Sequence, residues 1–462
     1  MNDTIAAIST APGEGGIGII RISGCTASDV IAKIFLSKNH KPGDLSQFKD
    51  RQMYYGHIVE PSSMETIDEV LVVYMKSPHS YTGEDVVEIQ CHGGPVPLRE
   101  ILSLVYKNGV TPATPGEFTK RAFLNGRIDL VQAGAVIELI NAKTDKGYKA
   151  AKSQTDGHLS KAINAIRMML LEVLAQITAR IDYPEAFDEG EAEEYLPSLL
   201  SAKKAVDDLI DTAETGRIVS NGLRTVIIGK PNAGKSSLFN TLARDDAAIV
   251  TNIAGTTRDA LEIMINIQGI PVVLTDTAGI READGQIEAL GIQKSKEAYE
   301  KSELAIFLLD GNKKIEPEDV EIAKQLDPDK KTLFVINKND MTQEMTDEEV
   351  KELVPFDAEI VRISAIEVNS VKALEEKIAA LVFSGKEVFG ADMLVTKETH
   401  KLLLCNALED ICEAIEIVSR GEAVEFAEVN VRAAYETLGE ILGETVTDDI
   451  LDKVFEEFCI GK

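Results

Sequence analysis

The chain has 462 residues, of which 44% are apolar and 27% charged, and 48 Lys and Arg face 77 Asp and Glu. At roughly 150 residues per domain this length predicts about three domains, and the composition is globular and not disordered. The net charge of −29 argues against a protein that coats nucleic acid non-specifically, because phosphate neutralisation needs an excess of Lys and Arg. A local basic patch, or a basic partner, stays compatible with it.

The five cysteines are few and scattered, which is typical of a reducing compartment and not of a disulfide framework. No apolar run approaches 18 residues, and the opening MNDTIAAIST lacks the basic and apolar regions of a signal peptide. The sequence therefore predicts a cytoplasmic protein without a membrane-spanning helix or a membrane partner.

The first 115 residues contain short β-rich runs at 17–23, 69–75 and 85–91, punctuated by Gly and Pro, which predicts a small α/β or α+β domain, by preference α+β. From about Leu130 to Asp182 the pattern becomes helical, with apolar residues three to four apart. A further helical stretch follows from about Leu196 to Thr212, and helical periodicity returns after Gly385.

Between these helical stretches, residues 222–385 show buried-strand runs at 224–229, 271–276, 304–310 and 332–337. The runs alternate with helical segments, which is typical of βαβ units and a parallel sheet. We therefore expect an α/β domain inserted into a discontinuous all-α helical domain. The expected boundaries are 1–118 for the N-terminal domain, 119–221 and 386–462 for the two helical parts, and 222–385 for the inserted domain.

The strongest motif is Gly229–Ser236, GKPNAGKS, which fits the phosphate-loop pattern GxxxxGK[ST] between a strand-like and a helical run. Backbone N–H groups of such a loop, together with the following helix N-terminus, bind phosphates. Lys235 is expected to reach the β and γ phosphates, and the Ser236 hydroxyl to bind Mg²⁺.

Three shorter elements follow in order. Asp276–Gly279 (DTAG) comes after the strand-like run PVVLT and is expected near the metal and the γ-phosphate. In Asn337–Asp340 (NKND), the Asp340 carboxylate can accept two N–H bonds from a guanine edge, which adenine cannot supply. Ser364 and Ala365 are expected to contact the base from its other side. Together with the phosphate loop these elements predict a Ras-like P-loop GTPase domain.

The segment Thr251–Asp259 (TNIAGTTRD) lies where an order–disorder switch belongs, and one of Thr256 and Thr257, by preference Thr257, is expected to bind Mg²⁺. The residues expected to bind GTP are Asn232, Ala233, Gly234, Lys235, Ser236, Ser237, Thr251, Asn252, Ile253, Ala254, Gly255, Thr256, Thr257, Asp276, Thr277, Ala278, Gly279, Asn337, Lys338, Asp340, Ser364 and Ala365.

The residue after DTAG is Ile280, where Ras-type GTPases have a Gln that orients water. Ile cannot do this, so the hydrolytic machinery must come from elsewhere. Asn232 and the polar switch segment suggest a bound cation in place of an arginine finger, unless Arg258 or Arg281 serves. Glu288 is the candidate for positioning water.

These motifs and their surroundings resemble the tRNA modification GTPase family MnmE, also called TrmE, over the whole chain. The N-terminal region carries PGEGGIGIIRISG at 12–24, SYTGEDVVEIQCHGG at 80–94 and TPGEFTKRAFLNGRIDL at 114–130, and the chain ends in FCIGK. The resemblance implies an N-terminal domain that binds a tetrahydrofolate derivative, either 5,10-methylene- or formyl-tetrahydrofolate, and that forms a homodimer. It also implies an MnmG-type flavoprotein partner in a heterotetramer, with FAD present only through that partner.

The resemblance further implies that the pair installs an aminomethyl-type group on C5 of the wobble uridine of certain tRNAs, and that hydrolysis of GTP requires K⁺. No DNA partner is implied. It assigns Asn232, Thr251, Ile253 and Thr256 to K⁺, Ser236 and Thr257 to Mg²⁺, Glu288 to the attacking water, and Arg21, Glu88, Arg127 and Lys462 to folate. The family often has Lys where this chain has Arg127, which keeps the charge but changes the geometry.

The competing interpretation is a GTP-switched ribosome-assembly factor. It is disfavoured by the single phosphate loop and by the lack of a KH-type GxxG loop in the C-terminal helical stretch. The acidic net charge also fits an enzyme whose basic partner binds the tRNA better than it fits a direct binder of ribosomal RNA.

Overall fold

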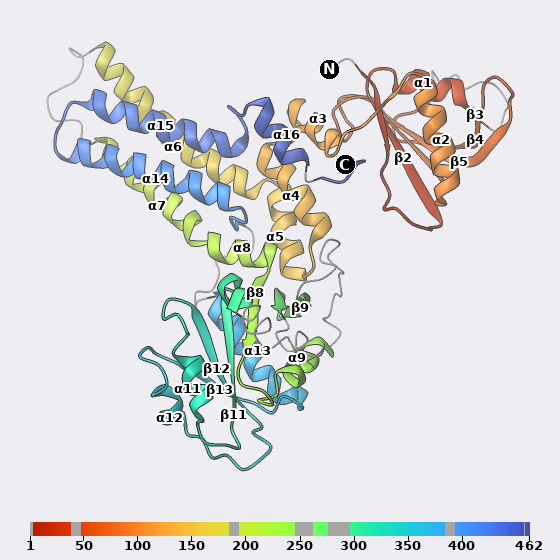
Figure 1. Cartoon of the computed structure of the whole chain (residues 1–462). Coiled ribbons are helices and arrows are strands. Elements are labelled where there is room, and N and C mark those ends of the chain that lie inside the picture. The colour runs from red at the N-terminus through yellow and green to blue at the C-terminus, as the bar shows by residue number, and fades with distance from the viewer. Residues whose placement is uncertain are drawn as a thin grey trace. The chain divides into compact units, whose positions relative to one another are not determined.

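The computed structural model of the chain describes residues 3–37, 48–183, 194–244, 262–275, 296–383, 393–456 and 458–462. Two compact units are present. The first comprises Met1–Ile137 with Gly439–Lys462, and the second comprises Glu138–Leu438. The chain thus combines an α+β N-terminal domain, an all-α domain and a P-loop GTPase domain, as the sequence predicts (Figure 1).

The first unit is built on a seven-stranded sheet in the order β3-β4-β5-β6-β2-β1-β7. Its strands are β1 (Ile5–Ile8), β2 (Ile17–Ser23), β3 (Phe35–Ser37), β4 (Met53–Val59), β5 (Thr66–Met75), β6 (Val86–His92) and β7 (Thr111–Pro112). Its helices are α1 (Ala27–Ile34), α2 (Pro95–Lys107), α3 (Glu117–Leu124), the start of α4 (Leu130–Asn141), the end of α15 (Val424–Leu442) and α16 (Asp448–Glu456). One core joins α1 and α2 to the sheet, because every second strand residue is apolar and buried, as at Ile20 and Ile22.

The helical part of the second unit contains α5 (Asp145–Thr155), α6 (His158–Asp182), α7 (Leu196–Asp211), α8 (Ala213–Asn221), α14 (Glu398–Ser419) and most of α15. Helix α6 buries its stripe from Leu159 to Ile177 and also Arg167, which donates to the Tyr435 carbonyl. Among the described helices α6 alone is long and apolar enough to cross a membrane, which the sequence had not led us to expect. One such helix is weak evidence, because buried core helices share that length and composition.

The GTPase domain contains a sheet in the order β13-β12-β11-β8-β10-β9, parallel except for the β9–β10 pair. Its elements are β8 (Leu223–Ile228), α9 (Lys235–Arg244), β9 (Glu262–Ile267), β10 (Ile270–Thr275), β11 (Leu304–Asp310), α11 (Pro317–Ala323), β12 (Lys331–Asn337), α12 (Asp347–Lys351), β13 (Glu359–Arg362) and α13 (Val368–Phe383). Strand β11 is buried on both faces, with Ile306 in one core cluster and Phe307 in the other. The carboxyl ends of the parallel strands therefore meet at one edge, where ligands bind in such sheets.

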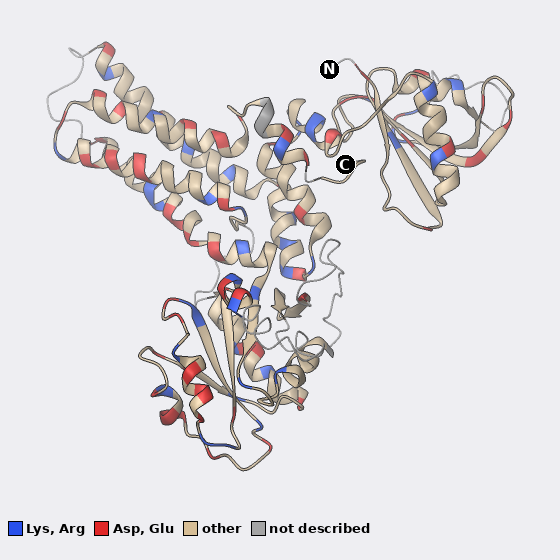
Figure 2. Ribbon diagram, viewed as in Figure 1, with Lys and Arg blue, Asp and Glu red and all other residues tan. Residues whose placement is uncertain are grey.

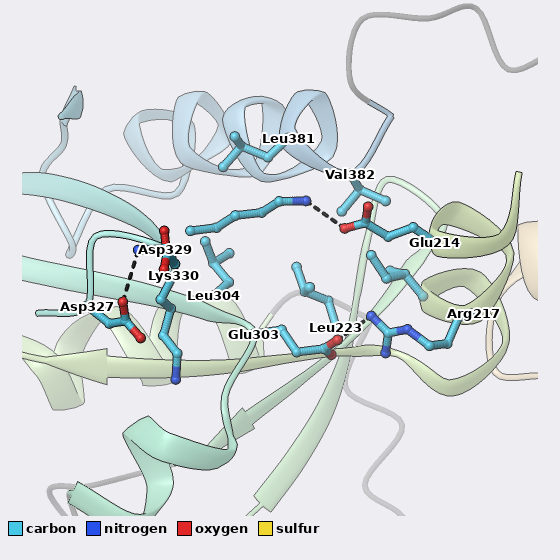
Figure 3. A pocket seen from close by; sticks show the side chains of 12 residues that line it. Glu214, Arg217, Leu223, Glu303, Leu304, Asp327, Asp329, Lys330, Leu381 and Val382 are labelled. Atoms are coloured by element: carbon cyan, nitrogen blue, oxygen red, sulfur yellow. Dashed lines mark hydrogen bonds and ion pairs between the residues drawn. The ribbon is translucent and has the colours of Figure 1, made fainter. Parts of the chain in front are cut away.

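The helical part meets the GTPase domain at the opposite edge of this sheet, around a pocket of about 310 Å³ (Figure 3). Helix α8 contributes Glu214, whose carboxylate lies 2.7 Å from Lys331 Nζ at the start of β12, and Arg217, which pairs with Glu303. Leu381 and the other apolar side chains line the rest. The Lys331–Glu214 and Arg217–Glu303 pairs each join α8 to the GTPase sheet, so this edge connects two parts of the unit.

Helix α8 passes very close to the chain before α14. A Cβ added at Gly216 would lie 2.3 Å from the Val395 carbonyl oxygen, which is closer than real side chains approach. Gly216→Ala is therefore expected to lower the free energy of unfolding by about 1–2 kcal/mol, since overpacking outweighs the better helix propensity of Ala. Denaturant unfolding measures this. Gly94→Ala is the control, because its Cβ would meet nothing closer than 3.4 Å, and equal stability of the two variants would contradict the expectation.

Acidic side chains mark much of α14 in Figure 2. Burial, together with the neighbouring carboxylates of Glu413 and Glu409, raises the pKa of Asp410 above its usual value. Like charges at this spacing repel one another and also repel nucleic-acid phosphates. These three carboxylates therefore give this part of α14 a negative surface charge that disfavours contact with phosphates.

Candidate nucleotide and one-carbon sites

The phosphate loop connects β8 to α9 and is shaped by two glycines. Gly229 has φ +147°, and a Cβ there would lie 2.3 Å from the Leu308 carbonyl oxygen. Gly234 has φ +104°, and a Cβ there would lie 2.2 Å from Asn337 Nδ2. Only glycine allows this close approach of the loop to β11 and β12. Lys235 Nζ donates to the carbonyls of Gly229 and Lys230, each at 2.8 Å.

The remaining phosphate-loop residues lie where the motif predicts. Asn232 is exposed and has φ +64°, and Ala233 is buried beneath the loop. Ser236 and Ser237 are exposed in the first turn of α9. Unpaired N–H groups at a helix N-terminus attract anions, and an exposed hydroxyl there can share a metal ion with a phosphate. The described residues contain no cluster of His, Cys, Asp and Glu that could hold a metal ion without such a phosphate.

The base-binding residues are joined to the phosphate loop through Asn337. Its Nδ2 donates to the Ala233 carbonyl at 2.7 Å, and its Oδ1 accepts from Ala365 N at 2.8 Å. Asp340 Oδ1 accepts from Ser364 Oγ at 2.7 Å. The structure therefore brings the phosphate loop, the NKND element and the Ser364–Ala365 element together at the carboxyl edge of the sheet.

Lys338 has a partner that the sequence motif does not reveal. It has φ +65°, and its Nζ lies 2.7 Å from Oδ2 of Asp310, whose side chain is 3% exposed. The signal available in the sequence is that the buried run LAIFLLD ends in an acid at the same sheet edge as NKND. We did not single out this acid from the sequence.

Several predicted residues fall outside the described residues, and their placement stays a prediction. They are Thr251, Asn252, Ile253, Ala254, Gly255, Thr256, Thr257, Asp276, Thr277, Ala278, Gly279, Ile280 and Glu288.

In the first unit, Arg21 on β2 stands directly opposite Glu88 on β6. Arg21 Nε and Nη2 lie 2.9 and 2.8 Å from Glu88 Oε1, and the two side chains are 14% and 18% exposed. Such a charge-assisted pair fixes the planes of both groups and leaves acceptor capacity on the carboxylate. It forms one part of a candidate site at the centre of the sheet.

The C-terminus of the chain reaches the same place. The Gly461 carbonyl accepts from Ser9 Oγ at 3.1 Å and from Arg21 Nη1 at 3.4 Å, and the Lys462 carbonyl accepts from Phe118 N at 3.2 Å. Burial, together with the nearby Arg21 charge, lowers the pKa of the Lys462 amine. The structure thus brings three of the four predicted folate residues, Arg21, Glu88 and Lys462, together from distant parts of the sequence.

Arg127 joins this group through Tyr81. Arg127 Nη1 donates to the Tyr81 carbonyl at 2.5 Å, and its Cζ lies 5.0 Å from the centre of the Tyr81 ring. Arg21 Cζ lies 5.3 Å from the same ring. We did not single out Tyr81 from the sequence, although it stands in the quoted segment SYTGED. The four predicted residues therefore form one cluster in which both guanidinium groups lie near the ring of Tyr81.

Two family descriptions together match most of the chain. The family description "MnmE helical domain" matches residues 130–459, and "GTP-binding protein TrmE N-terminus" matches residues 4–127. The tRNA modification GTPase MnmE of Alkaliphilus oremlandii is 46% identical over 463 residues, which is 100% of both chains. The chain belongs to the MnmE family. Another MnmE, from Clostridioides difficile, is 45% identical over 463 residues and 100% of both chains.

Solved structures that are similar cover only part of the chain. Aquifex aeolicus Era bound to GDP and AlF4⁻ is 27% identical, with a TM-score of 0.26, over 40% of this chain and 65% of that one. The G domain of the T. maritima FeoB iron transporter is 21% identical, also with a TM-score of 0.26, over 34% of this chain and 96% of that one. The MnmE assignment itself rests on the full-length relatives.

As a member of the MnmE family, the chain is a GTPase that acts in tRNA modification. This confirms the family and the enzyme class predicted from the sequence. It also favours tRNA modification over ribosome assembly, the competing interpretation.

Proposed function

We propose that this chain is a K⁺-dependent GTP hydrolase that, with an MnmG-type flavoprotein, modifies C5 of the wobble uridine of certain tRNAs. The added group is an aminomethyl or carboxymethylaminomethyl group, and its first carbon comes from a methylene-tetrahydrofolate unit. The observation that carries the proposal is the contact of the C-terminal residues with the Arg21–Glu88 pair. A cluster of two arginines, a carboxylate and a lysine, built from four distant segments, is more than a surface ion pair requires.

The residues of this cluster suit the chemistry of a folate. The Glu88 carboxylate can accept N–H bonds from a pterin edge, and Arg21 orients it by holding one oxygen. Arg127 can bind a carboxylate of the glutamate tail in a bidentate manner. The Lys462 amine lies close to Arg21 and Glu88, and burial together with the Arg21 charge lowers its pKa. A bound folate supplies the one-carbon unit, and these side chains bind and orient it.

In the GTPase domain, Ser236 and Thr257 are proposed to hold Mg²⁺ and Glu288 to orient the attacking water. Asn232, Thr251, Ile253 and Thr256 are proposed to hold K⁺, which would neutralise charge that develops on the β and γ phosphates. The support is that Asn232 stands exposed in the phosphate loop and Ile280 cannot orient water.

Exchanging Na⁺ for K⁺ at equal ionic strength is expected to raise kcat for GTP at least tenfold, about 1.4 kcal/mol of barrier. K⁺ fits a cage of carbonyl and hydroxyl oxygens that the smaller Na⁺ would occupy loosely. Steady-state phosphate release measures the effect. Asn232→Ala should lose the stimulation yet still bind nucleotide, whereas Asn240→Ala, on the exposed side of α9, should keep it. Equal rates in the two salts for the wild-type protein would return Arg258 and Arg281 to consideration.

The proposed assembly is a homodimer that joins the flavoprotein as a heterotetramer in the cytoplasm, with FAD bound by the partner alone. The division at 118, 221 and 385 is proposed as the functional domain division. Light scattering of the purified chain, alone and with the flavoprotein, measures the assembly. A monomer that forms no complex with the flavoprotein would contradict it.

A further inference from the structure

The segment 310–319, which leads from the end of β11 into α11, contacts both loops that hold the nucleotide. At one end Asp310 pairs with Lys338 of the base-binding element. At the other end Asp319 pairs with Lys230 of the phosphate loop. We call residues 310–319 the support segment.

The contact with the phosphate loop is buried. Lys230 Nζ lies 2.8 Å from Asp319 Oδ2 and 2.7 Å from Glu316 Oε2, and the Lys230 and Asp319 side chains are 4% and 0% exposed. Asp319 Oδ2 also accepts from Glu316 N at 3.0 Å, while Oδ1 has no hydrogen-bond partner among the described residues. A buried carboxylate that has one oxygen without a hydrogen-bond partner is stabilised mainly by its neighbouring cation. The second residue of the phosphate loop is therefore tied to the support segment by charge.

The contact with the base-binding element includes backbone as well as side chains. Gly311 N donates to the Asn337 carbonyl at 3.0 Å, directly beside the Asp310–Lys338 pair. A Cβ at Gly311 would lie 2.7 Å from that carbonyl oxygen. Only glycine therefore lets the two backbone segments approach this closely. The left-handed Lys338 thus follows a residue whose carbonyl is hydrogen-bonded to Gly311, and its own side chain is paired with Asp310.

We propose that Asp310 and Asp319 are positioning residues for GTP, which align the base-binding and phosphate-binding loops without touching the nucleotide. Asp310 sets the direction of the Lys338 side chain, whose carbon chain would otherwise swing freely beside the base. Asp319 anchors Lys230 and with it the carbonyls of Gly229 and Lys230 that hold Lys235. Loops aligned in advance bind ligand without a further ordering cost.

The charge state of Lys230 agrees with this assignment. Burial disfavours its ammonium form, but the hydrogen bonds and charges of Asp319 and Glu316 outweigh burial and raise the pKa of Lys230. The ammonium form of Lys230 is therefore favoured by its two carboxylate partners.

The test compares full-length variants binding two ligands, GTP and ribose 5′-triphosphate, which has no base, well below the unfolding temperature. Asp319→Asn should weaken binding of both ligands by about tenfold, because it loosens the phosphate loop. Asp310→Asn should weaken GTP by about tenfold and leave ribose 5′-triphosphate within about twofold, because it affects the base side alone. Glu318→Gln, on the exposed side of α11 next to Asp319, is the control and should match the wild type for both ligands.

If Asp319→Asn does not fold, the double variant Lys230→Met with Asp319→Leu removes both charges together and leaves no unpaired buried charge. It should show the same loss for both ligands. The assignment of Asp319 would be overturned if the double variant bound both ligands with wild-type affinity. It would also be overturned if a variant unfolded at a lower temperature but kept both affinities. Equal losses for both ligands in Asp310→Asn would overturn the assignment of Asp310 to the base side.

Discussion

Deleting Ile460–Lys462 is expected to abolish tRNA modification and folate binding while GTP hydrolysis stays within about twofold of the wild type. The deleted residues belong to the first compact unit, whereas the GTPase domain belongs to the second. The deletion removes the Gly461 carbonyl that accepts from Ser9 and Arg21, and it removes the Lys462 amine. Phe458, 5% exposed and packed against Phe455, stays in place, so the fold of the first unit is kept. Equilibrium binding of a tetrahydrofolate derivative and nucleoside analysis of tRNA measure the two losses.

Lys453→Ala is the matched control for this deletion, because it removes an exposed lysine of α16 close to the C-terminus. It should keep both folate binding and tRNA modification. A deletion variant that still modifies tRNA at the wild-type rate would remove the C-terminus from the one-carbon site. A variant that loses GTP hydrolysis as well would show that the last residues support the whole protein.

Asp340→Asn is expected to weaken GTP binding by roughly 1–3 kcal/mol, about 5- to 150-fold, because guanine N–H donors lose their ionised acceptor. In the structure Asp340 accepts from Ser364 Oγ, so its carboxylate is already directed toward the base-binding loop. The variant should gain affinity for xanthosine triphosphate, whose ring offers an acceptor where guanine offers a donor. Titration with both nucleotides measures the change.

Asp357→Asn provides the control for that substitution, because it changes another carboxylate of the same domain ahead of β13. It should leave the affinities for both nucleotides unchanged. Unchanged GTP affinity in Asp340→Asn would remove the residue from base recognition and leave the NKND element as an ordinary turn.

Much of the fold follows from local sequence patterns. The run IGIIRIS predicts a strand and is β2, and LAIFLLD is β11, because a buried strand needs either alternating or continuous apolar residues. The helical stripe after Leu159 is likewise α6. Strand β4, MYYGHIV, was not predicted, because its outer face mixes polar and aromatic residues and its periodicity is weak. Strand β13 has four residues, too few for a periodic signal.

The nucleotide loops could be predicted because their backbone geometry demands particular residues, as Gly229 and Gly234 illustrate. The residues that support these loops could not be predicted from the sequence. Asp310, Asp319 and Tyr81 act through partners 28, 89 and 46 residues away, and no local pattern records such a distance. These pairs form only in the folded chain. In the sequence alone, each residue looks like an ordinary acidic or aromatic residue on the surface.

The most direct test of the account is a reconstituted reaction of the purified chain with the flavoprotein, tRNA, GTP, K⁺ and methylene-tetrahydrofolate. Mass spectrometry of the digested tRNA measures the wobble nucleoside. The account predicts a C5-modified uridine that disappears when GTP, the folate or this chain is omitted, and that carries label from the folate one-carbon unit. A modified uridine that forms at the same rate without this chain, or that carries no folate label, would contradict it.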